Sequence, residues 1–235
     1  VPNTTLLRVI EHNTRMPARM MGDVYAQLAA LNTAEKDVLK LLAGMDVAVF
    51  RSYMSDLIDY TERLTRAKIA ELPDGVAEFT DWNDDDGAGG DPIKFHVKVT
   101  KKGDEFIVDF TGTSPQGRGA MHTNYAFTAS CACAALRCVI DPDMPNNAGF
   151  YKPITIIAPP GSFVNVQYPA ALGARGQGGY RIRSLVLGAL AHLVPDAIAA
   201  CAGGSEFAIV FAGYEGAARK PFLHLEFHNV SGQGG

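Results

Sequence analysis

The chain has 235 residues, of which 47% are hydrophobic and 20% charged, so it is long enough to bury a core and too apolar to be disordered. Its 21 basic and 25 acidic residues give a net charge of −4 with no basic patch, which argues against a nucleic-acid partner. No apolar run is long enough to cross a membrane and no secretory leader is visible, so we expect a cytoplasmic protein with no membrane partner. The four cysteines match no zinc or redox spacing, which is typical of buried, reduced thiols.

The first third of the chain has apolar residues at helical spacing. One helix is predicted from Pro17, which can occupy a first turn, through Leu31. A second helix is predicted to begin at Thr33, a candidate N-cap, and to end near Gly44.

A third helix is predicted after Asp46, whose side chain can cap it. Its apolar residues form a continuous stripe from Phe50 to Ala67, which favours a core or partner-helix contact over a ligand site. Pro73 would close this helix, so residues 1–73 are expected to form a helical segment.

From residue 75 onward, apolar and polar residues alternate, as in half-buried strands. An antiparallel meander is predicted over residues 75–111, with a turn at residues 102–104. The other predicted elements are a helix over residues 124–140, strands over 154–158 and 163–166, a helix over 181–193, and strands over 207–211 and 222–230. Because helices and mostly antiparallel strands are segregated, we expect an α+β fold, with residues 74–235 as an α+β domain after the helical segment.

Two loops invite a test for ligand-binding motifs. The acidic run Asp81–Gly87 fails as an EF-hand loop, because Asp86 stands where the turn needs glycine and Pro92 where a bidentate glutamate is needed. Residues 173–179 are rich in glycine but lack the lysine and hydroxyl of a Walker loop and the third glycine of a dinucleotide fold. We therefore expect no ATP site of either kind here.

The sharpest local signal is the segment from His224 to His228. On a strand, alternate residues share a face, so His224, Glu226 and His228 would project together. Two imidazoles and a carboxylate are ligand types of catalytic zinc, iron or manganese. A polar strand face in contact with water has the same sequence pattern, so both interpretations stay open.

A series of motifs in order covers nearly the whole chain. The most specific is Val108–Gln116, VDFTGTSPQ, followed by Gly119 and Asn124. The other segments are residues 13–17 (NTRMP), 22–27 (GDVYAQ), 84–87 (DDDG), 136–149 (LRCVIDPDMPNNAG), 153–162 and 169–171. Together they resemble the hydantoinase B/oxoprolinase family, which includes N-methylhydantoinase B-type subunits, 5-oxoprolinase, and acetone or acetophenone carboxylase subunits.

The resemblance implies part of an ATP-dependent enzyme that opens cyclic amides such as 5-oxoproline, N-methylhydantoin or lactams. It implies a hydantoinase A-type partner that binds ATP-Mg, and a divalent metal (zinc, iron or manganese) in the complete enzyme. The family's metal-binding motifs precede the segment matched here. The chain is therefore expected to be the central part of a longer subunit, to bind the remaining parts of that subunit, and to be inactive alone.

Three polar residues in the matching segments, Asp109, Asn124 and Arg175, are expected to line or brace the substrate cavity. Asp109 could equally cap a turn through Ser114 or Gln116. No catalytic residue is assigned. Two other functions stay open: a subunit of an ATP-dependent ketone carboxylase, and a non-catalytic scaffold for subunit assembly.

Overall fold

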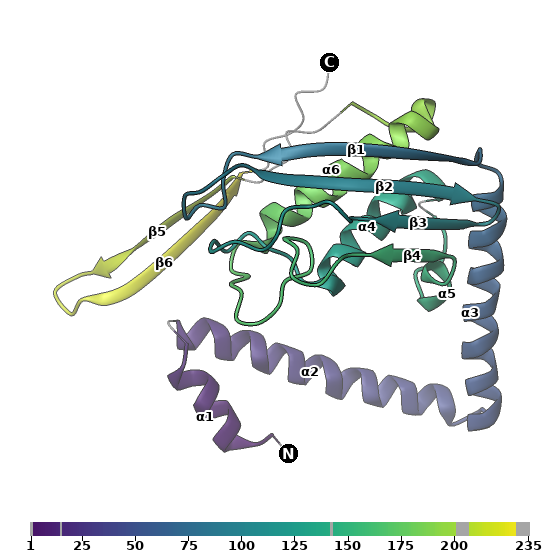
Figure 1. The fold of residues 1–235 in the computed structure, drawn as a ribbon. Helices are drawn as coiled ribbons and strands as arrows, with labels where there is room; N and C mark the ends of the chain where they lie inside the picture. Colours follow the sequence, from purple (N-terminus) through teal and green to yellow (C-terminus); the bar gives the residue numbers. More distant parts are fainter. Residues whose placement is uncertain (1, 15, 142, 201–206, 229–235) are drawn as a thin grey trace. The chain divides into compact units, whose positions relative to one another are not determined.

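The computed structural model describes residues 2–14, 16–141, 143–200 and 207–228, with side chains over 209–226 in the last segment. The chain divides into two compact units, residues 1–55 with 210–225 and residues 56–209 with 226–235. Figure 1 shows the elements of both. Helix changes to strand between Ala70 and Gly75, near the predicted position, whereas a separate domain over residues 1–73 stays a prediction.

The first unit consists of helices and a β-hairpin. Its elements are α1 (Thr4–His12), α2 (Pro17–Leu42), the first part of α3 (Val47–Ala70), and most of the hairpin of β5 (Phe207–Glu215) and β6 (Lys220–His228). Met21 is the only buried residue of α1 and α2. Arg19 donates a hydrogen bond from Nη1 to the Leu223 carbonyl at 3.2 Å, which ties α2 to β6. None of the described helices is both long and apolar enough to span a bilayer.

The two helices predicted on either side of Thr33 are one continuous helix, so the N-cap predicted there is wrong. No glycine or proline interrupts residues 23–42, and a threonine inside a helix costs less free energy than a break in the backbone hydrogen bonds. The predicted cap of the next helix is confirmed, because Asp46 Oδ1 accepts a hydrogen bond from the Ala48 N–H at 2.7 Å.

The second unit is built on a four-stranded sheet. Its strands are β1 (Gly75–Asn83), β2 (Ile93–Lys102), β3 (Glu105–Asp109) and β4 (Ile154–Ile157). The first three form the predicted antiparallel meander, while β4 pairs parallel to β3. The strand predicted over residues 163–166 is wrong, because a hydrogen bond from Asn165 N–H to the Ser162 carbonyl closes a turn there. Helices followed by this sheet confirm the α+β prediction.

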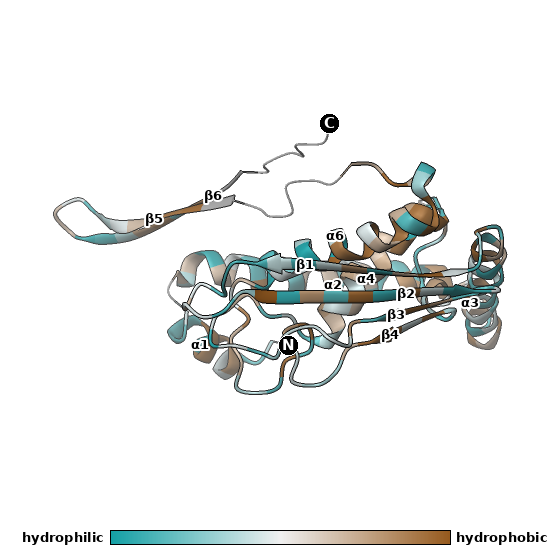
Figure 2. Ribbon diagram, turned by 45° about the horizontal axis from the view of Figure 1, so that its top comes forward, coloured by the Kyte–Doolittle hydropathy of each residue, from teal (hydrophilic) through white to brown (hydrophobic). Residues whose placement is uncertain are grey.

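The core of the second unit lies between the sheet and two helices, α4 (Tyr125–Ile140) and α6 (Arg175–Leu193), which also pack against each other. Apolar and polar residues alternate along β2, as Figure 2 shows, and its apolar side chains are buried in this core. Two short elements, α5 (Ala148–Tyr151) and the 3₁₀ helix η1 (Pro195–Ala197), complete the unit.

Helix α6 begins at Arg175 rather than at Arg181, so its predicted start is wrong. Two of the glycines before Arg181, Gly178 and Gly179, lie within the helix and serve close packing. A Cβ on Gly178 would overlap the Met121 carbonyl oxygen, and one on Gly179 would lie 2.6 Å from the Phe127 ring. Only glycine therefore lets the first turns of α6 approach α4 and the segment before it.

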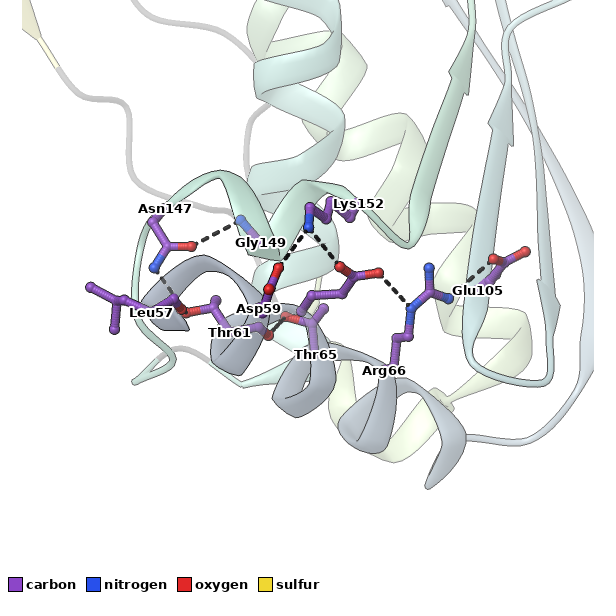
Figure 3. Close-up of polar contacts among 10 residues, drawn as sticks. Leu57, Asp59, Thr61, Thr65, Arg66, Glu105, Asn147, Gly149 and Lys152 are labelled. Carbon is purple, nitrogen blue, oxygen red and sulfur yellow. Dashed lines mark hydrogen bonds and ion pairs between the residues drawn. The ribbon is translucent and has the colours of Figure 1, made fainter. Parts of the chain in front are cut away.

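The second half of α3 is fixed to its unit by a network of charged side chains, drawn in Figure 3. Lys152 Nζ lies 3.2 Å from Asp59 Oδ1 and 2.8 Å from Glu62 Oε2. Arg66 bonds Glu62 through Nε at 3.0 Å and Glu105 through Nη1 at 3.1 Å. The hydrogen bonds from Lys152 and then Arg66 lower the pKa of Glu62, so they favour its charged form.

Backbone packing reinforces this network. Asn147 accepts a hydrogen bond from the Gly149 N–H at 2.9 Å and donates one to Thr61 Oγ1 at 2.8 Å. A Cβ on Gly149 would overlap the carbonyl oxygen of Ile58, so α5 approaches the α3 backbone through a glycine. Side-chain and backbone contacts thus bind the second half of α3 to the rest of the second unit.

Candidate functional site

Two loops of the second unit, between β1 and β2 and after β3, meet at Asp86. Its Oδ2 accepts a hydrogen bond from the Gly119 N–H at 2.6 Å, and its Oδ1 accepts one from Ala88 N–H at 3.0 Å. The hydrogen bond from Gly119, and after it the one from Ala88, lowers the pKa of the Asp86 carboxyl group. A Cβ on Gly119 would overlap the Asp86 carbonyl oxygen, so the contact requires glycine. We call this contact the Asp86 clasp.

A fully buried histidine supports the same loop. His122 Nε2 accepts a hydrogen bond from the Gly117 N–H at 2.8 Å, and its Nδ1 lies 3.2 Å from the Ala171 carbonyl oxygen. Because the Gly117 N–H is a donor, Nε2 carries no proton, and Nδ1 donates to Ala171. The neutral ring therefore joins two loops by two hydrogen bonds.

The polar residues of the VDFTGTSPQ motif also hold backbone. Thr113 Oγ1 accepts a hydrogen bond from His96 N–H at 3.1 Å, and Ser114 Oγ accepts one from Lys94 N–H at 2.9 Å. Gln116 exchanges two hydrogen bonds with the backbone of residue 167, at 2.7 and 3.3 Å. The motif therefore sets the shape of the loop after β3.

A pocket of about 360 Å³ opens beside the Asp86 clasp. Its lining includes one indole, two amides, two carboxylates and one guanidinium, from Trp82, Asn83, Gln177, Asp84, Asp85 and Arg181. Arg181, from α6, donates to Asp81 Oδ2 at 2.7 Å and to Asn83 Oδ1 at 2.8 Å. An indole offers a flat apolar surface and amides offer donors and acceptors, so this pocket suits a small polar ligand with a planar part. We call it the Trp82 pocket.

A second pocket, of about 450 Å³, is lined by Asp86 itself together with residues 89–93 and 114–118 and Phe163. Asp84 and Asp85, which line the Trp82 pocket, directly precede Asp86. Both pockets therefore depend on the shape of one loop, which the clasp fixes.

Comparison with known proteins identifies the family. The model of the hydantoinase B/oxoprolinase family matches residues 1–235. The chain belongs to this family. It is 29% identical over 224 residues to a protein of Pseudomonas sp. strain NS671 named as the putative B subunit of a D-/L-hydantoinase, and the match covers 91% of this chain and 38% of that protein. The chain spans less than two fifths of the length of the first curated relatives that it matches.

Two solved structures share the fold of this hydantoinase B/oxoprolinase member. The ATP-dependent caprolactamase from Pseudomonas jessenii matches with a TM-score of 0.79 and 21% identity, over 94% of this chain and 42% of that one. The nucleotide-free acetone carboxylase matches with a TM-score of 0.85 and 13% identity, over 96% of this chain and 32% of that one. At these identities the likeness shows a common fold.

The three residues expected to line or brace the substrate cavity of this family member make local contacts instead of lining either pocket. Asp109, at the end of β3, accepts a hydrogen bond from Thr111 N–H at 2.8 Å. Asn124 caps α4 by accepting one from Phe127 N–H at 3.0 Å, and the Arg175 guanidinium lies 5.7 Å from the centre of the Phe127 ring. A role for them in substrate binding stays a prediction.

The three metal ligands predicted on the last strand are only partly described. His224 and Glu226 occupy alternate positions of β6 and share a face, whereas the side chain of His228 lies outside the described residues. Among the side chains that the structure describes, no three His, Cys, Asp or Glu residues are grouped closely enough to hold a metal ion. The metal site therefore stays a prediction, and no chemical step is assigned to a metal here.

Sequence reasoning missed the Trp82 pocket and the clasp. The acidic run was tested only as an EF-hand loop, and no local spacing connected it with Arg181. One signal was available: an arginine in an apolar helix needs a carboxylate partner, and the acidic run supplies Asp81. Their separation along the chain kept them apart when only local patterns were considered.

Proposed function

We propose that this chain is part of the hydantoinase B-type subunit of an ATP-dependent cyclic amidohydrolase that opens a ring such as 5-oxoproline, N-methylhydantoin or a lactam. The observation that carries the proposal is the family match over the whole chain. A relative named as a hydantoinase subunit and a common fold with an ATP-dependent caprolactamase support it.

The Trp82 pocket supplies groups that suit this chemistry. A cyclic amide is flat, with one C=O acceptor and, when its nitrogen is unsubstituted, one N–H donor. It can stack on Trp82 and hydrogen-bond with the amides of Asn83 and Gln177. We assign these residues to binding and orienting the ring.

The complete enzyme has further parts in this proposal. A hydantoinase A-type partner binds ATP-Mg, and the remaining parts of the subunit contribute a divalent metal (zinc, iron or manganese). The enzyme works in the cytoplasm. The naming of the matched Pseudomonas protein as one subunit of a hydantoinase supports a partner chain.

The test is an assay of the complete subunit with its hydantoinase A-type partner. ATP-dependent ring opening is measured on a panel of lactams, hydantoins and 5-oxoproline. Trp82→Ala is expected to raise KM by about tenfold, since it removes the stacking surface. Tyr168→Ala is the matched control, because Tyr168 is 98% exposed and lies outside both pockets. Absence of ring opening on the whole panel contradicts the proposal.

A ketone carboxylase is the second candidate, favoured by the TM-score of 0.85 to acetone carboxylase. The two candidates differ in co-substrate. Phosphate or AMP release that requires a ketone and bicarbonate, with no release on cyclic amides, supports the carboxylase. Wild-type kcat and KM in Trp82→Ala and Arg181→Met would instead favour a scaffold role for this chain.

A further inference from the structure

The charges of the Trp82 pocket are unbalanced. Asp84 and Asp85 both line it, and no cation among the described residues forms an ion pair with either carboxylate. Asp85 Oδ1 accepts a hydrogen bond from the Gly87 N–H at 2.6 Å, which leaves its negative charge in place. Two carboxylates therefore face a ligand in this pocket.

The one cation of the described lining does not offset them. Arg181 Nη1 lies 2.7 Å from Asp81 Oδ2, and this ion pair neutralises the guanidinium. Its Nε donates to Asn83 Oδ1 at 2.8 Å, so a second donor direction is also occupied. Lys94 is the cross-strand neighbour of Trp82 but does not belong to the lining.

The groups that remain for recognition are uncharged. Trp82 is 52% exposed, so its ring can stack on a ligand. Because Asn83 Oδ1 already accepts from Arg181, the amide of Asn83 presents its NH₂ as a donor for a ring carbonyl. An uncharged ring gains these contacts without meeting a like charge.

We propose that the Trp82 pocket selects uncharged cyclic amides over rings that carry a carboxylate. The inference rests on the proposed function, since it takes the ring as the ligand of this pocket. A carboxylate placed a few ångströms from Asp84 and Asp85 is repelled by an amount that corresponds to about tenfold in affinity. The pocket thereby separates lactams and hydantoins from 5-oxoproline.

The experiment uses Trp82 as its own probe, because it is the only tryptophan of the 235 residues. The chain is titrated with 2-pyrrolidinone, 5-oxoprolinamide and 5-oxoproline while its fluorescence is recorded. All three contain the same lactam ring, and the last two differ only in a neutral amide against a carboxylate, which separates charge from size. We expect similar Kd values for the two neutral rings and about tenfold weaker binding of 5-oxoproline.

Variants test the cause. Asp84→Asn with Asp85→Asn is expected to reduce the difference between 5-oxoproline and its amide to less than about threefold, and each single change to reduce it in part. Asp196→Asn is the matched control, because this exposed residue lies on η1 and not in the lining, so the difference stays as in the wild type. Added salt is expected to reduce the difference as well.

Three results overturn the inference. Binding of 5-oxoproline as tight as its amide contradicts charge selection, and a difference that survives the double substitution contradicts its assignment to Asp84 and Asp85. No fluorescence change with any ring contradicts the pocket itself. The complete enzyme separates these failures from failure of the proposed function. Equal kcat/KM for 5-oxoproline and 5-oxoprolinamide contradicts only the proposed selectivity. Absence of any ring opening contradicts the proposed function as well.

Discussion

Helices α6 and α2 are both long, but only α6 buries many of its side chains within the described chain. Seven of the 19 residues of α6 are buried, against one of the 26 residues of α2. Leu185 of α6 is fully buried, whereas Leu31 of α2 is 67% exposed. Apolar spacing is helical in both, so the pattern predicts a helix without saying what covers it.

The difference separates two uses of an apolar residue. In α6 and α4 such residues form the core of the second unit, while in α2 and the first half of α3 they stay on the surface. A large exposed apolar surface on a folded chain marks an interaction site. This agrees with the proposal that the chain works inside a larger subunit.

The largest expected effect tests this comparison directly. Leu185→Ala removes buried contacts and leaves a cavity, so it should lower the free energy of unfolding by about 3 kcal/mol. Leu31→Ala, the matched change in α2, should lower it by less than about 0.5 kcal/mol. Urea denaturation of both variants measures this. A similar loss in both would mean that α2 is covered.

The second test concerns the covered half of α3. Gly149→Ala places a Cβ against the Ile58 carbonyl oxygen, so α5 or α3 must move, and we expect a loss of about 2 kcal/mol. Gly22→Ala in α2 is the control, since a Cβ there meets nothing within 4 Å. The expected outcome is a thermal midpoint lowered by Gly149→Ala and unchanged or slightly raised by Gly22→Ala, since alanine is favoured over glycine inside a helix. Equal midpoints would contradict the close approach.

The third test concerns the loop between β1 and β2, which the Asp86 clasp holds in place. The folded state lowers the pKa of Asp86 from 3.8, so its stabilising contribution is complete above that pH and disappears as the pH falls through the lower folded value. Asp86→Asn should therefore destabilise the protein at neutral pH, and the difference from wild type should shrink below about pH 3.8. Asp91→Asn, in the same loop, is the control. A difference that does not change with pH would contradict the clasp.

The smallest effect compares two faces of α4. Burial raises the pKa of the Cys133 thiol to about 11, whereas Cys138 is exposed. Because the thiolate is the reactive form, Cys138 should be alkylated first at neutral pH and Cys133 only after unfolding. Mass spectrometry of digested samples gives the order. Early labelling of Cys133 in the folded chain would show that α4 is not covered as described.

Sequence patterns predicted the features that depend on near neighbours. The predicted cap at Asp46 bonds the N–H group two residues ahead, and adjacent strands make the meander of β1, β2 and β3. Signals of this kind lie inside one short window. The helix after Asp46 and the three-stranded meander are therefore present in the structure, whereas the cap predicted at Thr33 is not.

The features that sequence patterns missed depend on distant residues. Glycines before Arg181 look like a loop until Met121 and Phe127 are known to pack against them. Arg181 meets Asp81 from one hundred positions away, and Asp86 meets Gly119 from a different loop. Only the tertiary structure brings these groups together, so the candidate site could not be predicted from local spacing.

The parallel pairing of β4 with β3 has a consequence for folding kinetics. The strands β1, β2 and β3 join through short connections, so they can pair early, whereas β4 must wait for the crossover through α4 and α5 that spans residues 110–153. Closing that long loop carries an entropic cost before the new contacts form. The loop after β3, which shapes both pockets, lies inside this crossover, so the binding surface should be among the last parts of the second unit to assemble.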